Sequence, residues 1–188
     1  MNADKQPTES YFSKMKGITK SPPAVNLSEI FWSWIGAFLG ISAVSYLHFN
    51  IFLISTDFEM LVGSFGASAV LIYGAIKSPL AQPRNLIGGH IISAIVGVSC
   101  YQLICPYCMW LGAALAVATA IAAMHATKTL HPPGGATALI AVIGSDKIHH
   151  LGFMYAIFPV GIGAMIMLLV ALLVNNIPSS RRYPEFWL

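Results

Sequence analysis

The chain has 188 residues, of which 56% are hydrophobic and 9% are charged, whereas soluble domains carry about 25% charged residues. No Lys, Arg, Asp or Glu falls between Arg84 and Lys128 or between Lys147 and Arg181, which excludes a soluble surface over both stretches. The net charge of +3 gathers near the two ends, which disfavours a nucleic-acid surface and leaves an all-α integral membrane protein as the predicted fold class.

Residues 1–28 are predicted to form a cytoplasmic amino-terminal tail. This stretch holds charges and prolines but no apolar core, so it lacks the pattern of a secretory signal. The membrane domain is expected over residues 29–178, followed by a cytoplasmic carboxy-terminal tail over residues 179–188. About six apolar stretches in that domain are predicted to enter the membrane, at residues 30–49, 60–76, 86–104, 109–127, 134–144 and 151–177.

The fifth of these stretches is too short to cross a membrane as a helix. At a rise of about 1.5 Å per residue it reaches about 16 Å, against a hydrocarbon core about 30 Å thick. The segment can cross if the chain enters the membrane in irregular form from Thr129 through Pro133. Irregular backbone at that depth is tolerated only inside protein or beside water.

The loop charges predict that both termini lie in the cytoplasm. Cytoplasmic loops carry an excess of Lys and Arg, and these residues fall on one side of the predicted topology. The loops and tail placed inside contain Lys77, Arg84, Lys128, Arg181 and Arg182. The loops placed outside contain Asp57, Glu59, residues 105–108 and residues 146–150. The expected location is a bacterial inner (plasma) membrane.

Two short matches indicate an internal duplication. Trp-Ile-Gly-Ala at residues 34–37 matches Trp-Leu-Gly-Ala at residues 110–113, and Gly-Ala-Ser-Ala at residues 66–69 resembles Gly-Ala-Thr-Ala at residues 135–138. A unit of three crossings inverts its copy, so the matches predict two inverted three-segment repeats. The alternative is that small residues recur by chance in a membrane protein. The predicted repeats cover about residues 30–104 and about residues 107–177.

Segments two and five are predicted to be broken or re-entrant helices that form a binding site. Interrupted segments at matching positions of two repeats are where transporters place their substrate sites. A helix that begins inside the membrane leaves unpaired N–H groups and a positive dipole end, which attract an anion. The alternative is that these small residues only allow close helix packing. The residues expected to bind the substrate are Ser64, Gly66, Ser68, His131, Pro132, Pro133, Gly134, Gly135 and Thr137.

Three motifs occur in order along the chain. Residues 63–71 read Gly-Ser-Phe-Gly-Ala-Ser-Ala-Val-Leu, residues 78–85 read Ser-Pro-Leu-Ala-Gln-Pro-Arg-Asn before a Gly-Gly-His at residues 88–90, and residues 131–139 read His-Pro-Pro-Gly-Gly-Ala-Thr-Ala-Leu. Together they resemble the HPP family of small integral membrane proteins, over about residues 30–175. Members in plastids and cyanobacteria are implicated in nitrite transport. The resemblance therefore implies transport of nitrite or a related small monovalent anion, with nitrate, formate and chloride left open.

Two other classes of function are weighed against transport. A membrane anchor or assembly subunit without its own flux is the main alternative. A membrane-embedded enzyme is disfavoured because no carboxylate lies within an apolar segment and no nucleophile–base pair appears. The expected partners are a small anion, the lipid bilayer and a second copy of the chain in a homodimer.

Three residues are predicted at the mouth of the pathway, and a fourth beside the double proline. Lys77 and Arg84 can attract anions to a cytoplasmic mouth, although both also fit the positive charge of cytoplasmic loops. His90 is assigned to the same mouth, with a packing role as the alternative. His131 can relay a proton or pair with an anion, or its ring can bond an orphan backbone carbonyl beside Pro132.

No metal or cofactor is expected. His149 and His150 are adjacent, but a metal site needs further ligands nearby. The Cys-Pro-Tyr-Cys sequence at residues 105–108 also occurs in glutaredoxin-like active sites, but those lie between a strand and a helix. Here it joins two apolar segments, which predicts a tight turn with an outer-face disulfide as one option.

Overall fold

The computed structural model describes residues 10–16, 18–52 and 63–188, whose regular structure is helical throughout. Among the described residues, four helices are long and apolar enough to cross a membrane, and two shorter apolar helices accompany them. The long ones are α1 (Leu27–Leu47) with its π-helical extension η2 (His48–Phe52), α4 (Pro83–Leu103), α5 (Met109–Ala126), and α8 (Ile162–Val174) with the preceding η5 (Ala156–Gly161). The shorter ones are α3 (Ser64–Ala69), continued by η3 (Val70–Gly74), and α6 (Pro132–Ile143). The remaining pieces are η1 (Ser13–Met15), η4 (Pro79–Ala81) and α7 (Asp146–Leu151).

Local sequence explains where these helices begin. The side chain of Asn26 caps α1 by accepting a hydrogen bond from the Glu29 N–H at 2.9 Å. Both α4 and α6 begin with proline at the first helical position, where a missing N–H costs nothing. Because Pro83 can start a helix, α4 begins three residues before the apolar stretch predicted from Leu86.

The last predicted segment, residues 151–177, is interrupted in the structure. Phe158 has an extended backbone (φ −130°, ψ 124°), because the residue before a proline is disfavoured in helical conformation and Pro159 follows it. The short helix α7 ends at Leu151, the first residue of this segment, and its C-cap Gly152 has a φ of +50°, which suits glycine. The membrane-length helical stretch, Ala156–Val174, therefore contains a kink at Phe158.

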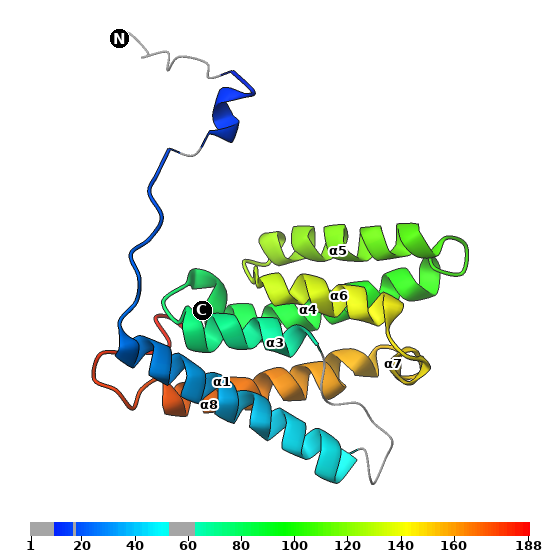
Figure 1. The fold of residues 1–188 in the computed structure, drawn as a ribbon. Helices are drawn as coiled ribbons and strands as arrows, with labels where there is room; N and C mark the ends of the chain where they lie inside the picture. The colour runs from blue at the N-terminus through cyan, green and yellow to red at the C-terminus, as the bar shows by residue number, and fades with distance from the viewer. Residues whose placement is uncertain (1–9, 17, 53–62) are drawn as a thin grey trace.

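The helices form two layers (Figure 1). The first layer contains α1, α3 with η3, and α8, and the second contains α4, α5 and α6, which pack closely on one another. The layers meet where α3 contacts α6 and where α4 contacts η5 and α8. Helices α1, α4 and α6 run in one direction and α3, α5 and α8 in the other.

Glycines allow the first layer to close around an aromatic side chain. A Cβ atom on Gly36 would lie 2.7 Å from Cδ1 of Tyr73, so only glycine lets α1 approach η3 at this point. The hydroxyl of Tyr73 donates to the Met167 carbonyl on α8 at 3.0 Å. Tyr73 therefore joins all three elements of the first layer.

Basic residues gather at one end of the molecule, here named the basic end. This end contains the start of α1, the loop of residues 75–82, the turn of residues 127–131 and the chain after α8 (Figure 1). Its cations include Lys77, Arg84, Lys128, Arg181 and Arg182. The charged residues described at the opposite end are Asp146 and Lys147, while Asp57 and Glu59 lie outside the described residues.

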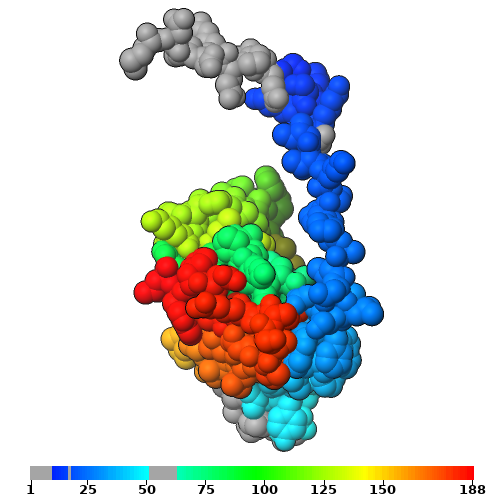
Figure 2. Space-filling view, turned by 90° about the vertical axis from the view of Figure 1, so that its left-hand side faces the viewer, coloured from blue at the N-terminus to red at the C-terminus, as the bar shows by residue number. Residues whose placement is uncertain are grey.

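The chain after α8, which includes the predicted carboxy-terminal tail, packs against the helices. Figure 2 shows this segment lying on the helical body, with residues 18–26 extending away from it. The Arg181 and Tyr183 side chains are buried. Tyr183 donates its hydroxyl to the Ala81 carbonyl at 2.7 Å, and the Glu185 N–H donates to the Gln82 side chain at 2.9 Å. The segment thereby fastens the loop that joins α3 to α4.

Candidate functional site

The first two turns of α3 and α6 lie side by side in opposite directions at the junction of the two layers. The hydroxyls of Ser64 and Thr137 are 2.8 Å apart, and the Ser68 hydroxyl lies 2.9 Å from Nε2 of His131. From this contact α3 continues toward the basic end and α6 toward the opposite end (Figure 1). The amino-terminal turns of two half-length helices therefore meet inside the molecule.

His90 of α4 joins these side chains into one chain of hydrogen bonds. Its Nε2 atom lies 2.7 Å from the Ser68 hydroxyl, and its Nδ1 atom lies 2.7 Å from the Thr137 hydroxyl. All the side chains involved are at most 1% exposed. We name this group the central polar network; its members are Ser64, Ser68, His90, His131 and Thr137.

His131 is held in a fixed orientation by a backbone carbonyl. Its Nδ1 atom lies 2.8 Å from the Leu80 carbonyl oxygen, which can only accept a hydrogen bond, so Nδ1 carries a hydrogen. The sequence left open a bond to a carbonyl beside Pro132. The partner is instead a carbonyl of the loop between α3 and α4, and the ring bonds both this carbonyl and Ser68.

The chain enters α6 through an irregular stretch, residues 127–131, whereas the sequence predicted an irregular entry from Thr129 through Pro133; both prolines already belong to α6. Helix α5 ends in a Schellman motif, with Lys128 at φ +57° and the Thr129 N–H donating to the Met124 carbonyl at 2.9 Å. Two neighbouring side chains of α4 then donate hydrogen bonds to carbonyls of this stretch. Arg84 donates to the Thr127 carbonyl and Asn85 to the Leu130 carbonyl, each at 2.8 Å.

The backbone amides of α6 contribute fewer donors than the sequence suggested. Pro132 and Pro133 have no N–H, and the Gly134 N–H donates to the His131 carbonyl at 2.8 Å. Hydroxyls and imidazoles therefore take the place of the α6 backbone amides as hydrogen-bond donors in this site. The Pro133 carbonyl takes part as an acceptor, 3.3 Å from the Thr137 hydroxyl.

Not all of the predicted binding residues face the network. Gly134 packs against α4, where an added Cβ atom would lie 2.7 Å from the Ser93 hydroxyl. Gly66 faces a groove of about 460 Å³ between α1 and α3, while Pro132 and Gly135 face a groove of about 590 Å³ between α5 and α6. Gly66, Pro132 and Gly135 therefore lie on the sides of α3 and α6 that face away from the network.

A model of the HPP transmembrane region matches residues 22–184 of the chain. The chain belongs to the HPP family. This HPP chain is also similar to two proteins of Dictyostelium discoideum, each named as a transmembrane protein, with 50% identity over 180 residues and 46% over 182 residues. Each alignment covers 94% of the HPP chain but only 57% and 63% of the relatives, so the chain spans about three fifths of their length. No solved structure matches it.

The three predicted mouth residues of the HPP chain lie at different depths. Lys77 is exposed on the loop after η3, and Arg84 is partly exposed in the first turn of α4. Both lie at the basic end. His90 lies in the central polar network instead of at the mouth, because it follows Arg84 by six residues, a rise of about 9 Å along the helix.

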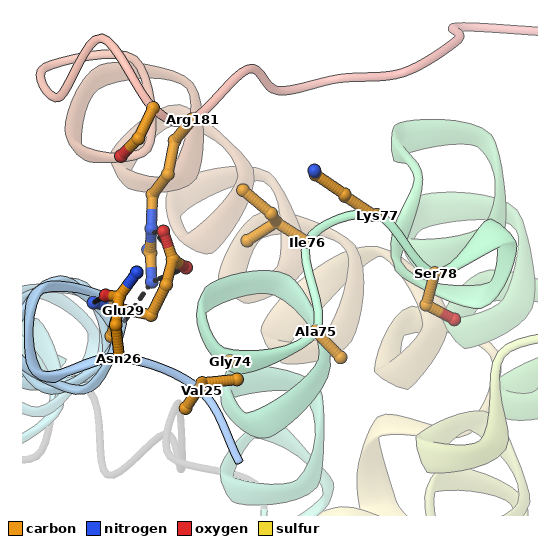
Figure 3. A pocket seen from close by; sticks show the side chains of 10 residues that line it. Val25, Asn26, Glu29, Gly74, Ala75, Ile76, Lys77, Ser78 and Arg181 are labelled. Atoms are coloured by element: carbon orange, nitrogen blue, oxygen red, sulfur yellow. Dashed lines mark hydrogen bonds and ion pairs between the residues drawn. The ribbon is translucent and has the colours of Figure 1, made fainter. Parts of the chain in front are cut away.

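Lys77 lines a pocket of about 540 Å³ at the basic end of the HPP chain (Figure 3). Arg181 and Glu29 point toward each other on one side of it, and their side chains form an ion pair at 2.9 Å. The Arg181 guanidinium also donates to the Ser33 hydroxyl at 2.8 Å, to the Glu29 carbonyl at 2.8 Å, to the Asn175 side chain at 3.2 Å and to the Tyr73 carbonyl at 3.3 Å. The sequence placed Arg181 among the topology charges. Its partners come from α1, from η3 and from Asn175 just after α8, and no local sequence pattern predicts them.

The described residues of the HPP chain contain no group of three or more His, Cys, Asp or Glu side chains that could hold a metal. Cys100, Cys105 and Cys108 are free thiols, so the outer-face disulfide that the sequence allowed is absent. Burial, with smaller contributions from Cys100 and Cys108, raises the pKa of the Cys105 thiol in the loop between α4 and α5. A raised pKa disfavours the thiolate that redox chemistry requires.

Proposed function

We propose that this HPP chain transports a small monovalent anion across the membrane, with nitrite as the expected substrate, and that the anion binds at the central polar network. The observation that carries the proposal is the meeting of five buried polar side chains where two half-length helices and α4 converge. Polar groups inside a membrane protein are costly and mark substrate and ion pathways. A structural role for the network would not require both helices to begin at it.

The charges around the network favour an anion over a cation. The described carboxylates are Glu29 in the first turn of α1, Asp146 in α7 and Glu185 near the end of the chain, so none belongs to the network. The cations of the basic end can raise the local concentration of an anion at that end. Hydroxyls and imidazoles can then donate hydrogen bonds to it.

A site built from neutral side chains also permits release. Conduction and transport require binding that is favourable enough for entry and weak enough for exit. A buried unpaired Arg would hold the anion and would be costly to insert. In the described conformation the network groups bond one another, so an incoming anion must take over donors now directed at neighbouring side chains.

We further propose that the two halves are inverted repeats around this site. The opposite directions of α1 and α5, of α3 and α6, and of α4 and α8 support this arrangement (Figure 1). Ser68 and Thr137 occupy matching positions in the duplicated sequence, and each hydroxyl bonds a different nitrogen of His90. The concentration of cations at the basic end supports a cytoplasmic position for that end and hence for both termini.

The test is anion flux in liposomes that contain only this chain. We expect nitrite uptake above that of protein-free vesicles, and a reduction of at least tenfold for Thr137→Val. Valine matches threonine in shape but removes the hydroxyl that contacts both His90 and Ser64. Thr137→Ser is the matched control, because it keeps the hydroxyl, and it should retain most of the uptake.

Two outcomes would contradict the proposal. Folded, inserted protein without flux of nitrite, nitrate, formate or chloride would favour the membrane anchor or assembly subunit. Equal uptake by the wild type and Thr137→Val would show that anions pass elsewhere. Thermal unfolding of both variants in detergent separates loss of flux from loss of the fold.

A further inference from the structure

The number of hydroxyl hydrogens in the central polar network limits which of its imidazole nitrogens are protonated. Ser68 has one hydroxyl hydrogen, but its oxygen lies 2.7 Å from Nε2 of His90 and 2.9 Å from Nε2 of His131. It can donate to only one of them, so the other nitrogen must carry a hydrogen and donate to the Ser68 oxygen. The two rings are therefore coupled through a single hydroxyl.

With both rings neutral, every hydrogen bond has one direction. His131 donates from Nδ1 to the Leu80 carbonyl, so its Nε2 accepts from Ser68. His90 then donates from Nε2 to the Ser68 oxygen, and its Nδ1 accepts from the Thr137 hydroxyl. The single Thr137 hydroxyl hydrogen is then directed at His90 and not at the Ser64 oxygen, which lies 2.8 Å away.

One additional proton fits this network without moving a heavy atom. If it resides on His90, Nδ1 donates to the Thr137 oxygen and the Thr137 hydroxyl turns to Ser64. If it resides on His131, the Ser68 hydroxyl turns to Nε2 of His90 and accepts from Nε2 of His131. The Ser68 hydroxyl moves the proton between the rings by giving its own hydrogen to Nε2 of His131 while it takes the Nε2 hydrogen of His90.

A second additional proton does not fit. With both rings charged, the Ser68 oxygen would receive two donors and its own hydrogen would lose its acceptor. Two cationic rings would also repel each other, because their centroids are 5.0 Å apart. The network therefore has room for one extra proton.

Few other titratable groups face this part of the molecule. On the elements that pack against α4, these are His131 before α6, His125 near the end of α5 and Tyr155 before η5, while α6 and α8 contain none. His125 is exposed, and the Tyr155 hydroxyl donates to the Thr137 carbonyl at 3.3 Å. The two imidazoles are thus the groups that can hold the proton.

We propose that the central polar network carries one proton with each monovalent anion, so that transport is an electroneutral symport of anion and proton. This inference rests on the proposed function. The singly protonated network has one positive charge, which the bound anion neutralises. The loaded site is therefore neutral when it changes from facing one side of the membrane to facing the other. The proton enters from water on one side with the anion and leaves to water on the other.

The experiment uses the full chain in liposomes with a pH indicator inside. An inward gradient of nitrite, with nitrate as a second probe, should acidify the interior by one proton per anion beyond the protein-free leak. Nitrate is needed because nitrous acid crosses lipid as a neutral molecule, whereas nitric acid is fully ionised at neutral pH. An interior more alkaline by one pH unit should accumulate the anion about tenfold at zero potential.

The outcomes separate the two proposals. No flux of either anion would overturn the proposed function and this inference with it. Flux that follows the membrane potential and moves no proton would overturn the symport and leave anion transport standing. One proton per anion, with no response to the potential, supports the symport.

Two serine variants, one in the central polar network and one outside it, test the proton relay through Ser68. Ser68→Ala should abolish accumulation driven by the pH gradient. Ser93→Ala should not, because Ser93 is also buried but its hydroxyl donates to the Met124 sulfur at 3.5 Å, outside the central polar network. Unchanged proton coupling in Ser68→Ala would overturn the relay, and the proton count of the wild type tests the symport even if that variant fails to fold.

Discussion

Ser68 and Thr137 show how far single residues of the site are predictable. Both were expected in the site because small residues and hydroxyls recur at matching positions of the duplicated sequence, and the structure places both on His90. The place of His90 itself was not predictable. Its depth follows from helix rise, but the face of α4 that meets α3 and α6 depends on packing that no local pattern records.

Two adjacent glycines of α6 should respond oppositely to substitution. A Cβ atom on Gly134 would lie 2.7 Å from the Ser93 hydroxyl and 2.9 Å from the Gly89 carbonyl, so Gly134→Ala forces the helices apart. Overpacking of this kind costs about 1–3 kcal/mol. Gly135→Ala meets only Val117, at 3.9 Å, and should leave stability unchanged or raise it.

Thermal unfolding of the two variants in detergent measures the difference. The midpoint for Gly134→Ala should fall well below that for Gly135→Ala. Equal midpoints would mean that α4 and α6 are not packed as closely as the structure has them.

At the scale of elements, the irregular stretch before α6 was predictable, but the hydrogen-bond donors that stabilise it were not. The apolar run was too short to cross, and the double proline marked a helix start, so an irregular entry followed from helix geometry alone. The carbonyls of this stretch are satisfied by Arg84 and Asn85, more than 40 residues earlier in the chain. Such long-range partners depend on which helices pack together.

Asn85→Leu should destabilise the entry to α6. Leucine is close to asparagine in size but leaves the Leu130 carbonyl without its donor, and an unsatisfied buried group costs about 1–3 kcal/mol. Because His131 follows Leu130 directly, anion uptake should fall as well. Gln102→Leu is the matched control, since it makes a similar change at an exposed position of the same helix. An unfolding midpoint for Asn85→Leu equal to that of the control would argue against this role.

At the scale of the whole molecule, the charges that predicted topology include one with a structural role. Arg181 and Arg182 look alike in the sequence, yet the Arg181 guanidinium is buried and bonded to α1, η3 and Asn175, while Arg182 is exposed. The sequence predicted the helical membrane class from its uncharged stretches. It could not separate these two cations, because the difference arises only when the chain after α8 folds back.

Arg181→Gln should therefore lower the free energy of unfolding, and Arg182→Gln should not. We expect a loss of about 1–3 kcal/mol for Arg181→Gln, because Glu29 is 30% exposed and water can replace part of the lost partner. Unfolding in detergent at low and high salt measures both variants. A similar midpoint for the two would show that the segment after α8 contributes little to stability.

The boundary between the two layers has a consequence for movement. Ser64 and Ser68 belong to the first layer, whereas His90, His131 and Thr137 move with the second. The second layer is one continuous piece of chain, joined to the first by residues 75–82 and 144–155. If the layers shift as rigid bodies, these two connectors act as hinges, and the serine contacts break while the bond between His90 and Thr137 survives. Opening would then expose the imidazoles on one wall of the gap and the serine hydroxyls on the other.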